Sequence, residues 1–243
     1  MPGAGAVHQI KLGNNGSAGG LLEIAREKIV RVDASAAVLE ATYPASHALA
    51  MDVAAFLARP EAQDLQRSAW GSDELSAARA AMRTNEPISE ISIAGVAAAN
   101  FFAALAEALP RDVRLVTDTG LHQVMLRRHL DVKTPGGLLM PSDLQSMGFG
   151  LPAAIAARFA DPSRPVVALI GDGGLRMTGF ELGTAVRERI ALTVIVVNDG
   201  CLNQIRMQQL REFGASSGTE LGQLDVGAFA DTIGSGYQYA GAP

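Results

Sequence analysis

The sequence has a single cysteine, Cys201, and few aromatic side chains. One cysteine excludes an intramolecular disulfide and argues against a cysteine-based zinc site. The longest apolar segment, residues 93–109, contains Asn100 and Glu107, which indicates a buried helix rather than a membrane span. The first residues lack the basic start and apolar core of a signal peptide. We therefore expect a soluble, cytoplasmic protein that does not bind a membrane.

The sequence also has fewer positively charged than negatively charged residues. The 20 lysines and arginines are outnumbered by 25 aspartates and glutamates, which gives a net charge of −5 over 243 residues. This balance argues against a general nucleic-acid surface. Hydrophobic residues make up 48% of the chain, enough for a well-formed core in one large domain or two small ones.

A regular alternation of strands and helices begins near residue 91. Apolar strands are predicted at 114–117, 166–170 and 192–197, and helices at 95–109, 147–160, 180–189, 204–213 and 226–233. Apolar strands separated by helices indicate an α/β fold, with an open parallel sheet and helices on both faces.

The first ninety residues are less regular. A helical turn is predicted at 21–26, a strand at 29–33, and a strand followed by a helix over 48–57. These elements indicate the tail of an α/β unit rather than a complete one. The predicted organisation is therefore a partial α/β segment over 1–60, a polar linker over 61–90 with one helix near 73–82, and an α/β domain over 91–243.

Three short loops that carry candidate ligand-binding residues follow the three predicted strands. They are Asp118-Thr119-Gly120, Gly171-Asp172-Gly173-Gly174 and Asn198-Asp199-Gly200-Cys201. Ligands of open parallel sheets bind beyond the carboxyl ends of the strands. We therefore expect the three loops to line one crevice.

The glycine-rich loop around Asp172 has the composition of a phosphate site. Its glycines let the backbone approach a ligand closely, so that the N–H groups of Gly173 and Gly174 can bind a phosphate. A carboxylate beside a phosphate would repel it unless a cation lies between them, so Asp172 indicates Mg²⁺. Asp199, 27 residues later, and a carbonyl such as that of Cys201 would add oxygen ligands. A glycine-aspartate turn alone is common, but the pairing of two such turns favours the metal site.

The segment GDGGLRMTGFELGTAVRERIALTVIVVNDG resembles the cofactor signature of thiamine-diphosphate-dependent enzymes, a GDG motif followed after a spacer by an Asn-Asn pair or a variant of it. The resemblance implies thiamine diphosphate and Mg²⁺ as cofactors, with Asp172, Asp199 and the main-chain oxygen of Cys201 on the metal. Asp199 stands where the family more often has asparagine. Either residue offers an oxygen, but the extra charge should favour the metal and slightly weaken diphosphate binding.

Two further segments resemble the acetolactate-synthase branch of that family. TDTGLHQ (117–123) is similar to its diphosphate-contacting segment, and SMGFGLPAAIAA (146–157) is similar to the segment whose bulky residue bends the cofactor into a V shape. Taken alone, His122 would be interpreted as a surface histidine and Met147 as core filler, but the place of His122 at a strand end beside Gly120 favours a site residue. The cofactor-binding residues implied are Gly120, His122, Gln123, Met147, Gly148, Gly171, Asp172, Gly173, Gly174, Asn198 and Asp199.

The predicted helix that follows the Asn198–Cys201 turn indicates the type of reaction. LNQIRMQQLREFG (202–214) resembles the acetolactate-synthase helix, whereas pyruvate-decarboxylase relatives carry a catalytic glutamate where this chain has Ile205. Because an apolar side chain cannot donate a proton, the resemblance favours decarboxylation of a 2-oxo acid with carboligation. Gln208 and Gln209 are either site residues or ordinary solvent-facing residues. Cys201 is better explained as a small residue in a tight turn than as a reactive thiol.

The glutamate that activates the cofactor in this family lies on a pyrimidine-binding domain, which nothing before residue 90 resembles. Glu23, Glu27 and Glu40 belong to a segment similar to the end of the family's central domain, and the C-terminus stops where relatives continue with another helix and strand. We expect that domain to come from another chain or from a missing region, within a homo- or hetero-oligomer. The catalytic residues, the particular 2-oxo acid and FAD binding are left open for the same reason.

Three alternatives remain. The chain could be a non-catalytic cofactor-binding fragment, or a 2-oxo acid decarboxylase of the same superfamily. A Mg²⁺-dependent nucleotide-binding α/β domain ranks last, because the sequence lacks a GxxxxGK[ST] loop.

Overall fold

The computed structural model describes residues 7–8, 29–41, 45–59, 71–84, 92–93, 96–142 and 144–239. By its internal contacts the chain divides into two units, Met1–Ser76 and Ala77–Pro243. The domain boundaries expected near residues 60 and 90 stay predictions. Within the described ranges, no helix is both long and apolar enough to cross a membrane.

The N-terminal unit contains a small parallel sheet. Its strands β1 (Val7–His8), β2 (Ile29–Asp33) and β3 (His47–Ala50) pair in that order, with helices α1 (Ala36–Ala41) and α2 (Val53–Leu57) following β2 and β3. The carboxylate of Asp52 accepts hydrogen bonds from the N–H groups of Ala54 and Ala55, which explains where α2 begins. The strand at 29–33 and the strand and helix over 48–57 are confirmed. The turn predicted at 21–26 lies outside the described residues.

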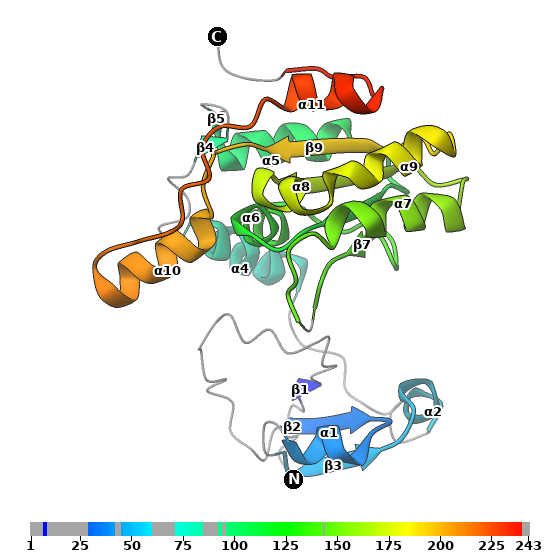
Figure 1. Cartoon of the computed structure of the whole chain (residues 1–243). Coiled ribbons are helices and arrows are strands. Elements are labelled where there is room, and N and C mark those ends of the chain that lie inside the picture. The colour runs from blue at the N-terminus through cyan, green and yellow to red at the C-terminus, as the bar shows by residue number, and fades with distance from the viewer. Residues whose placement is uncertain are drawn as a thin grey trace. The chain divides into compact units, whose positions relative to one another are not determined.

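The C-terminal unit is organised around a four-stranded parallel sheet (Figure 1). Its strand order is β7-β6-β8-β9, and the strands are β6 (Arg114–Thr117), β7 (Leu138–Leu139), β8 (Val166–Gly171) and β9 (Thr193–Val197). A short antiparallel pair, β4 (Ser92–Ile93) and β5 (Val96–Ala97), lies in the same unit. The open parallel sheet expected from the apolar segments is therefore confirmed.

Helices cover both faces of this sheet. They are α5 (Ala98–Ala108), α6 (Leu121–His129), α7 (Gly150–Ala160), α8 (Asp172–Thr178), the 3₁₀ turn η3 (Gly179–Glu181), α9 (Leu182–Arg187), α10 (Asn203–Phe213) and α11 (Val226–Ile233). A further helix, α4 (Ser72–Thr84), contains the boundary between the units. Val167 and Leu169 of β8 join a core with Phe102 of α5, whereas Ala168 and Ile170 join a second core with α7. This alternation explains the wholly apolar strand, because each of its two faces is buried.

Two helices at the strand ends were not expected from the sequence. α6 begins directly after Gly120, and α8 begins at Asp172, so the glycine-rich loop is itself the first turn of a helix. Conversely, the helix predicted over 147–160 begins only at Gly150, and the one predicted over 180–189 ends at Arg187. Residues 147–149 are therefore left as the loop that enters α7.

Candidate functional site

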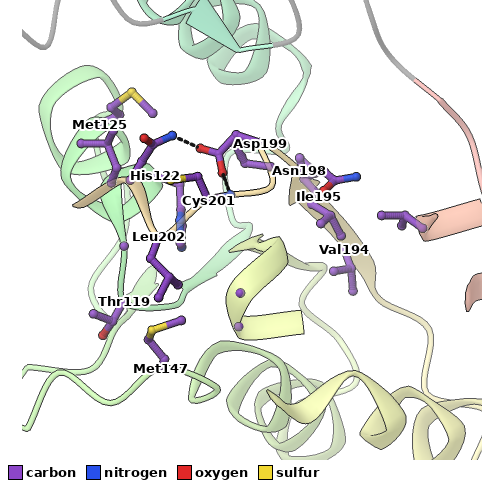
Figure 2. A pocket seen from close by; sticks show the side chains of 18 of the residues that line it. Thr119, His122, Met125, Met147, Val194, Ile195, Asn198, Asp199, Cys201 and Leu202 are labelled. Carbon is purple, nitrogen blue, oxygen red and sulfur yellow. Dashed lines mark hydrogen bonds between the residues drawn. The ribbon is translucent and has the colours of Figure 1, made fainter. Parts of the chain in front are cut away.

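The three loops at the carboxyl ends of β6, β8 and β9 line one cavity of about 1220 Å³ (Figure 2). Its lining includes Thr119 and Gly120 after β6, Gly173 and Gly174 after β8, and Asn198, Asp199 and Cys201 after β9. The edge of β9 itself and residues 236–239 form another part of the wall. The crevice expected from the strand ends is present.

Most of the residues singled out in the sequence face this cavity. Those that line it are Gly120, His122, Met147, Gly173, Gly174, Asn198, Asp199 and Cys201; Gln123, Gly148, Gly171 and Asp172 are not in the lining. Gly171 ends β8, and Asp172 opens α8 next to the lining residue Gly173. The roles predicted for these twelve residues remain predictions, but the fold brings their loops together.

Asp172 is a buried carboxylate, only 2% exposed. Its Oδ2 atom has no hydrogen-bond partner within the described parts of the chain. The Arg176 Nε atom lies 4.0 Å from it, while another guanidinium nitrogen donates to the Gly222 carbonyl at 2.7 Å. Burial, and next the charge of Asp199, raise the pKa of the Asp172 carboxyl. An unsatisfied buried oxygen costs about 1–3 kcal/mol, so this position suits a cation that would complete it.

Asp199 is the exposed residue of a turn, Asn198 to Cys201, that its own side chain holds together. One carboxylate oxygen accepts the N–H of Cys201 at 3.1 Å, and the other accepts the side-chain amide of Asn203 at 2.6 Å (Figure 2). Gly200 has a φ of +68°, which suits glycine. The Leu221 N–H donates to the Gly200 carbonyl at 2.7 Å and ties the turn to a neighbouring segment. The turn is therefore formed without a ligand, and it lies close enough to Asp172 to raise the pKa of that carboxyl.

Side chains alone do not make a closed metal site here. Among the described residues, no group of three or more histidine, cysteine, aspartate or glutamate side chains gathers to hold an ion. The predicted set of two carboxylates and one carbonyl would leave the remaining positions of an octahedral Mg²⁺ to water and to ligand oxygens. Mg²⁺ bound together with phosphates has that arrangement, so the residues fit a magnesium-diphosphate ligand.

Met147 packs over the first turn of α8. A Cβ atom added to Gly173 would lie 2.9 Å from the Met147 Cε atom and 3.0 Å from a methyl group of Leu202. Gly173 therefore admits both apolar side chains, and Figure 2 shows Met147 and Leu202 among the residues that line the cavity. This contact places an apolar surface directly beside the backbone that would bind a phosphate.

His122 is buried in the first turn of α6, at 6% exposed. Burial lowers the pKa of His122 to about 4, and a hydrogen bond with the Asp118 backbone only partly opposes this. Its Nε2 atom, like the side-chain nitrogen of Gln123, has no partner among the residues described. A neutral imidazole adds no positive charge, so His122 can offer a ligand only a directional hydrogen bond.

Glycines on both sides make room for this imidazole. Gly120 has a φ of +154°, and a Cβ there would lie 2.6 Å from the His122 Cε1 atom. A Cβ at Gly171 would lie 3.2 Å from the same ring. Glycine at these positions therefore lets the ends of β6 and β8 close around His122.

Two polar groups near the cavity had no role predicted from the sequence, which named Asp118 only as part of the Asp118-Thr119-Gly120 loop and did not single out Gln204. Asp118 is 1% exposed and accepts the N–H groups of Thr119 and Gly148, each at 2.8 Å. Gln204 lines the cavity from α10, and its side-chain oxygen is buried without a partner in the described structure. An aspartate at the end of an apolar strand was the available signal for Asp118, whereas nothing distinguished Gln204 from its glutamine neighbours.

Comparison with known proteins points to one family. A family model described as the C-terminal TPP-binding domain of thiamine pyrophosphate enzymes matches residues 118–240, about half of the chain. An acetolactate synthase of Bacillus subtilis (strain 168) is 31% identical over 131 residues, 54% of this chain and 23% of that protein. The large subunit of acetolactate synthase isozyme 2 from Escherichia coli (strain K12) is 36% identical over 105 residues, 43% and 19% respectively. The chain spans less than a quarter of these curated relatives.

A solved structure shares the fold. The thiamine diphosphate-dependent 4-hydroxybenzoylformate decarboxylase of Rhodococcus jostii RHA1 matches with a TM-score of 0.68 and 24% identity, over 85% of this chain and 37% of that one. At this identity the likeness shows the α/β architecture alone.

Proposed function

The chain belongs to the thiamine pyrophosphate enzymes, and from this membership we propose that it binds thiamine diphosphate with Mg²⁺ for acetolactate-synthase-like chemistry on 2-oxo acids. The observation that carries the proposal is the buried Oδ2 atom of Asp172, which has no hydrogen-bond partner in the described chain and faces the charge of Asp199. When bound, the cofactor supplies the carbon that stabilises the negative charge left after a 2-oxo acid loses carbon dioxide.

In this proposal each loop has a separate task. Asp172, Asp199 and the carbonyl of Cys201 hold the metal. The backbone N–H groups of Gly173 and Gly174 hold the diphosphate, because glycine lets a ligand approach closely. Gly120, His122 and Gln123 line the opposite strand end, where two buried side-chain nitrogens lack partners among the described residues.

The composition of α10 supports carboligation over simple decarboxylation. The residues of α10 that line the cavity, together with Leu202 directly before the helix, are Leu202, Asn203, Gln204, Ile205 and Gln208. None of them titrates, so this helix offers no proton donor at the position where decarboxylase relatives carry glutamate. A 2-oxo acid decarboxylase would have to take its proton from elsewhere, which keeps that activity as the alternative.

The activating acid has to come from outside this cavity. The described lining contains no glutamate. We therefore propose that a pyrimidine-binding domain, on another chain or in another region of the protein, completes the site within an oligomer. The matched segments cover only 23% and 19% of these curated relatives, which leaves room in them for such a domain.

Calorimetry tests the cofactor proposal. Thiamine diphosphate is titrated into the protein with Mg²⁺ and with a chelator, and thiamine without phosphates serves as the control ligand. Binding should require both the metal and the diphosphate. Equal affinity with the chelator, or no binding under any condition, would contradict the proposal.

A product assay tests the reaction. The protein, supplied with the complementary pyrimidine-binding domain, is incubated with pyruvate, thiamine diphosphate and Mg²⁺. Acetolactate is the expected product. Acetaldehyde as the sole product would favour the decarboxylase alternative, and tight binding without either product would favour a non-catalytic cofactor-binding fragment.

A further inference from the structure

The carboxylate of Asp118 belongs to neither the proposed metal site nor the proposed diphosphate site, yet it is nearly inaccessible to solvent. Its two oxygens accept the N–H groups of Thr119 and of Gly148, which lies thirty residues away. Burial raises the pKa of the Asp118 carboxyl, and the N–H groups of Thr119, Gly148, Phe149 and Gly150 lower it. A buried charge is tolerated only where such donors surround it.

These donors belong to the loop that carries Met147 into α7. The residue before α7, Phe149, has no side chain that could accept a hydrogen bond, so α7 lacks a cap of its own. Asp118 supplies the missing acceptor from the end of β6. The position of residues 147–150 therefore depends on a carboxylate that lies on a different strand.

Asp118 also touches the first turn of α8. A Cβ atom added to Gly174 would lie 2.1 Å from the Asp118 Oδ2 atom, so the carboxylate occupies the space that a side chain would fill. Thr178 strengthens the same junction, since its hydroxyl donates to the carbonyl of Gly148 at 3.1 Å. One carboxylate thus joins the end of β6, the Met147 loop and the α8 turn.

We propose that Asp118 is a positioning residue that sets the Met147 loop against the Gly173–Gly174 turn, so that a ligand bound through its diphosphate also meets the apolar surface of Met147. The proposal rests on the function proposed above. It also makes a claim about the ligand-free protein, because the junction exists without any ligand.

Hydrogen exchange tests the junction in the ligand-free protein. Asp118→Asn keeps the size of the side chain but presents an NH₂ group to one of the two N–H donors. Amides of residues 146–150 and 173–176 should exchange at least about tenfold faster, while β8 keeps its protection. Asp161→Asn is the matched control, since Asp161 lies at the other end of α7 and its carboxylate accepts from Ser163. Unchanged exchange at 146–150, or an equal rise in β8, would overturn the proposal.

Gly174→Ala provides an independent route to the same measurement if the asparagine variant does not fold. The methyl group added at position 174 would displace the Asp118 carboxylate from the side of α8. The same amides of residues 146–150 should then lose protection, and retained protection there would overturn the proposal.

Ligand discrimination separates positioning from general destabilisation. Mg²⁺-pyrophosphate reaches only the diphosphate turn, whereas Mg²⁺-thiamine diphosphate extends beyond it. Asp118→Asn should weaken thiamine diphosphate binding by about tenfold or more and pyrophosphate binding by less than about threefold. In a double-mutant cycle with Met147→Ala, the two losses should be strongly non-additive.

Additive losses in that cycle, or equal weakening of both ligands, would overturn the positioning role. A wild-type protein that bound neither ligand would instead overturn the proposed function. The exchange measurement would still decide whether Asp118 holds the junction.

Discussion

The two loops proposed to hold the metal, at residues 171–174 and 198–201, are built in opposite ways. Asp172 is buried, and one of its oxygens has no hydrogen-bond partner among the described residues. Asp199 is exposed, and both of its oxygens accept hydrogen bonds from its own turn. The second loop is thus stable without a ligand, whereas the first carries an unfavourable charge that a cation would relieve. If the proposed metal site is formed, we expect metal affinity to come mainly from Asp172 and pre-organisation of the site mainly from Asp199.

Removing the buried carboxylate should have the largest effect. Asp172→Ala is expected to weaken Mg²⁺-dependent binding of thiamine diphosphate by about 1000-fold, roughly 4 kcal/mol, because the other buried carboxylate at the α8 turn, Asp118, already accepts the N–H groups of Thr119 and Gly148. Calorimetry at fixed Mg²⁺ gives the affinity, with Asp161→Ala as a control distant from the loop. An affinity within about threefold of wild type would contradict the proposal that Asp172 contributes most of the metal affinity.

Burial of His122 should also make the folding stability of the protein sensitive to acid. The pKa of His122 is about 4 in the fold and 6.5 when unfolded. The contribution of the neutral imidazole to the free energy of unfolding is therefore complete above pH 6.5 and is lost as the pH falls toward 4. The full loss corresponds to about 3 kcal/mol. Urea unfolding of wild type and His122→Gln at pH 7, 5.5 and 4.5 measures it. The difference between the two proteins should shrink with acid, and a constant difference would contradict the prediction.

The buried charge of Asp172 should cost stability in the absence of ligand. Its pKa is raised in the fold, so the protonated form favours folding and stability falls as the pH rises through that pKa. Asp172→Asn imitates the protonated form and should stabilise the ligand-free protein by about 1 kcal/mol, a rise in Tm of about 2–4 °C. Thermal unfolding at neutral pH checks this. Asp199→Asn is the matched variant and should raise the Tm by less, because it removes only the repulsion from Asp199 and leaves the larger cost of burying Asp172.

The smallest effect is expected at the exposed turn. Asp199→Asn keeps an oxygen for the N–H of Cys201 and should change cofactor affinity by less than about threefold, whereas Asp199→Ala loses the turn and should cost about tenfold. The same titrations measure both variants. If Asp199→Asn were as damaging as Asp172→Ala, the two loops would contribute equally and the comparison would fail.

The sheet could be predicted from the sequence because its central strands are buried on both faces. The strand predicted at 114–117 matches β6, and β8 extends the strand predicted at 166–170 by one residue. The helices α6 and α8 could not be predicted. α8 contains two glycines in its first turn, and glycine disfavours a helix by about 1 kcal/mol unless tertiary contacts compensate.

The site was predictable only as far as side-chain patterns reach. Two glycine-aspartate turns after apolar strands were enough to predict that the loops of Asp172 and Asp199 meet at one cavity, which Gly173, Gly174 and Asp199 line. The role of Asp118 left no such pattern, because its partners are backbone N–H groups thirty residues away. The burial of His122 could not be predicted from the sequence either, because it depends on the space that glycine, which has no side chain, leaves at positions 120 and 171.

The single cysteine of the chain gives the exposed turn a built-in reporter. Cys201 is a buried free thiol that follows Asp199 and borders the cavity. A thiol reagent would reach it only when the turn opens, and the chain offers no second cysteine to confuse the signal. The labelling rate of the unmodified protein can therefore report how often this loop opens, and whether adding Mg²⁺ and thiamine diphosphate slows that opening.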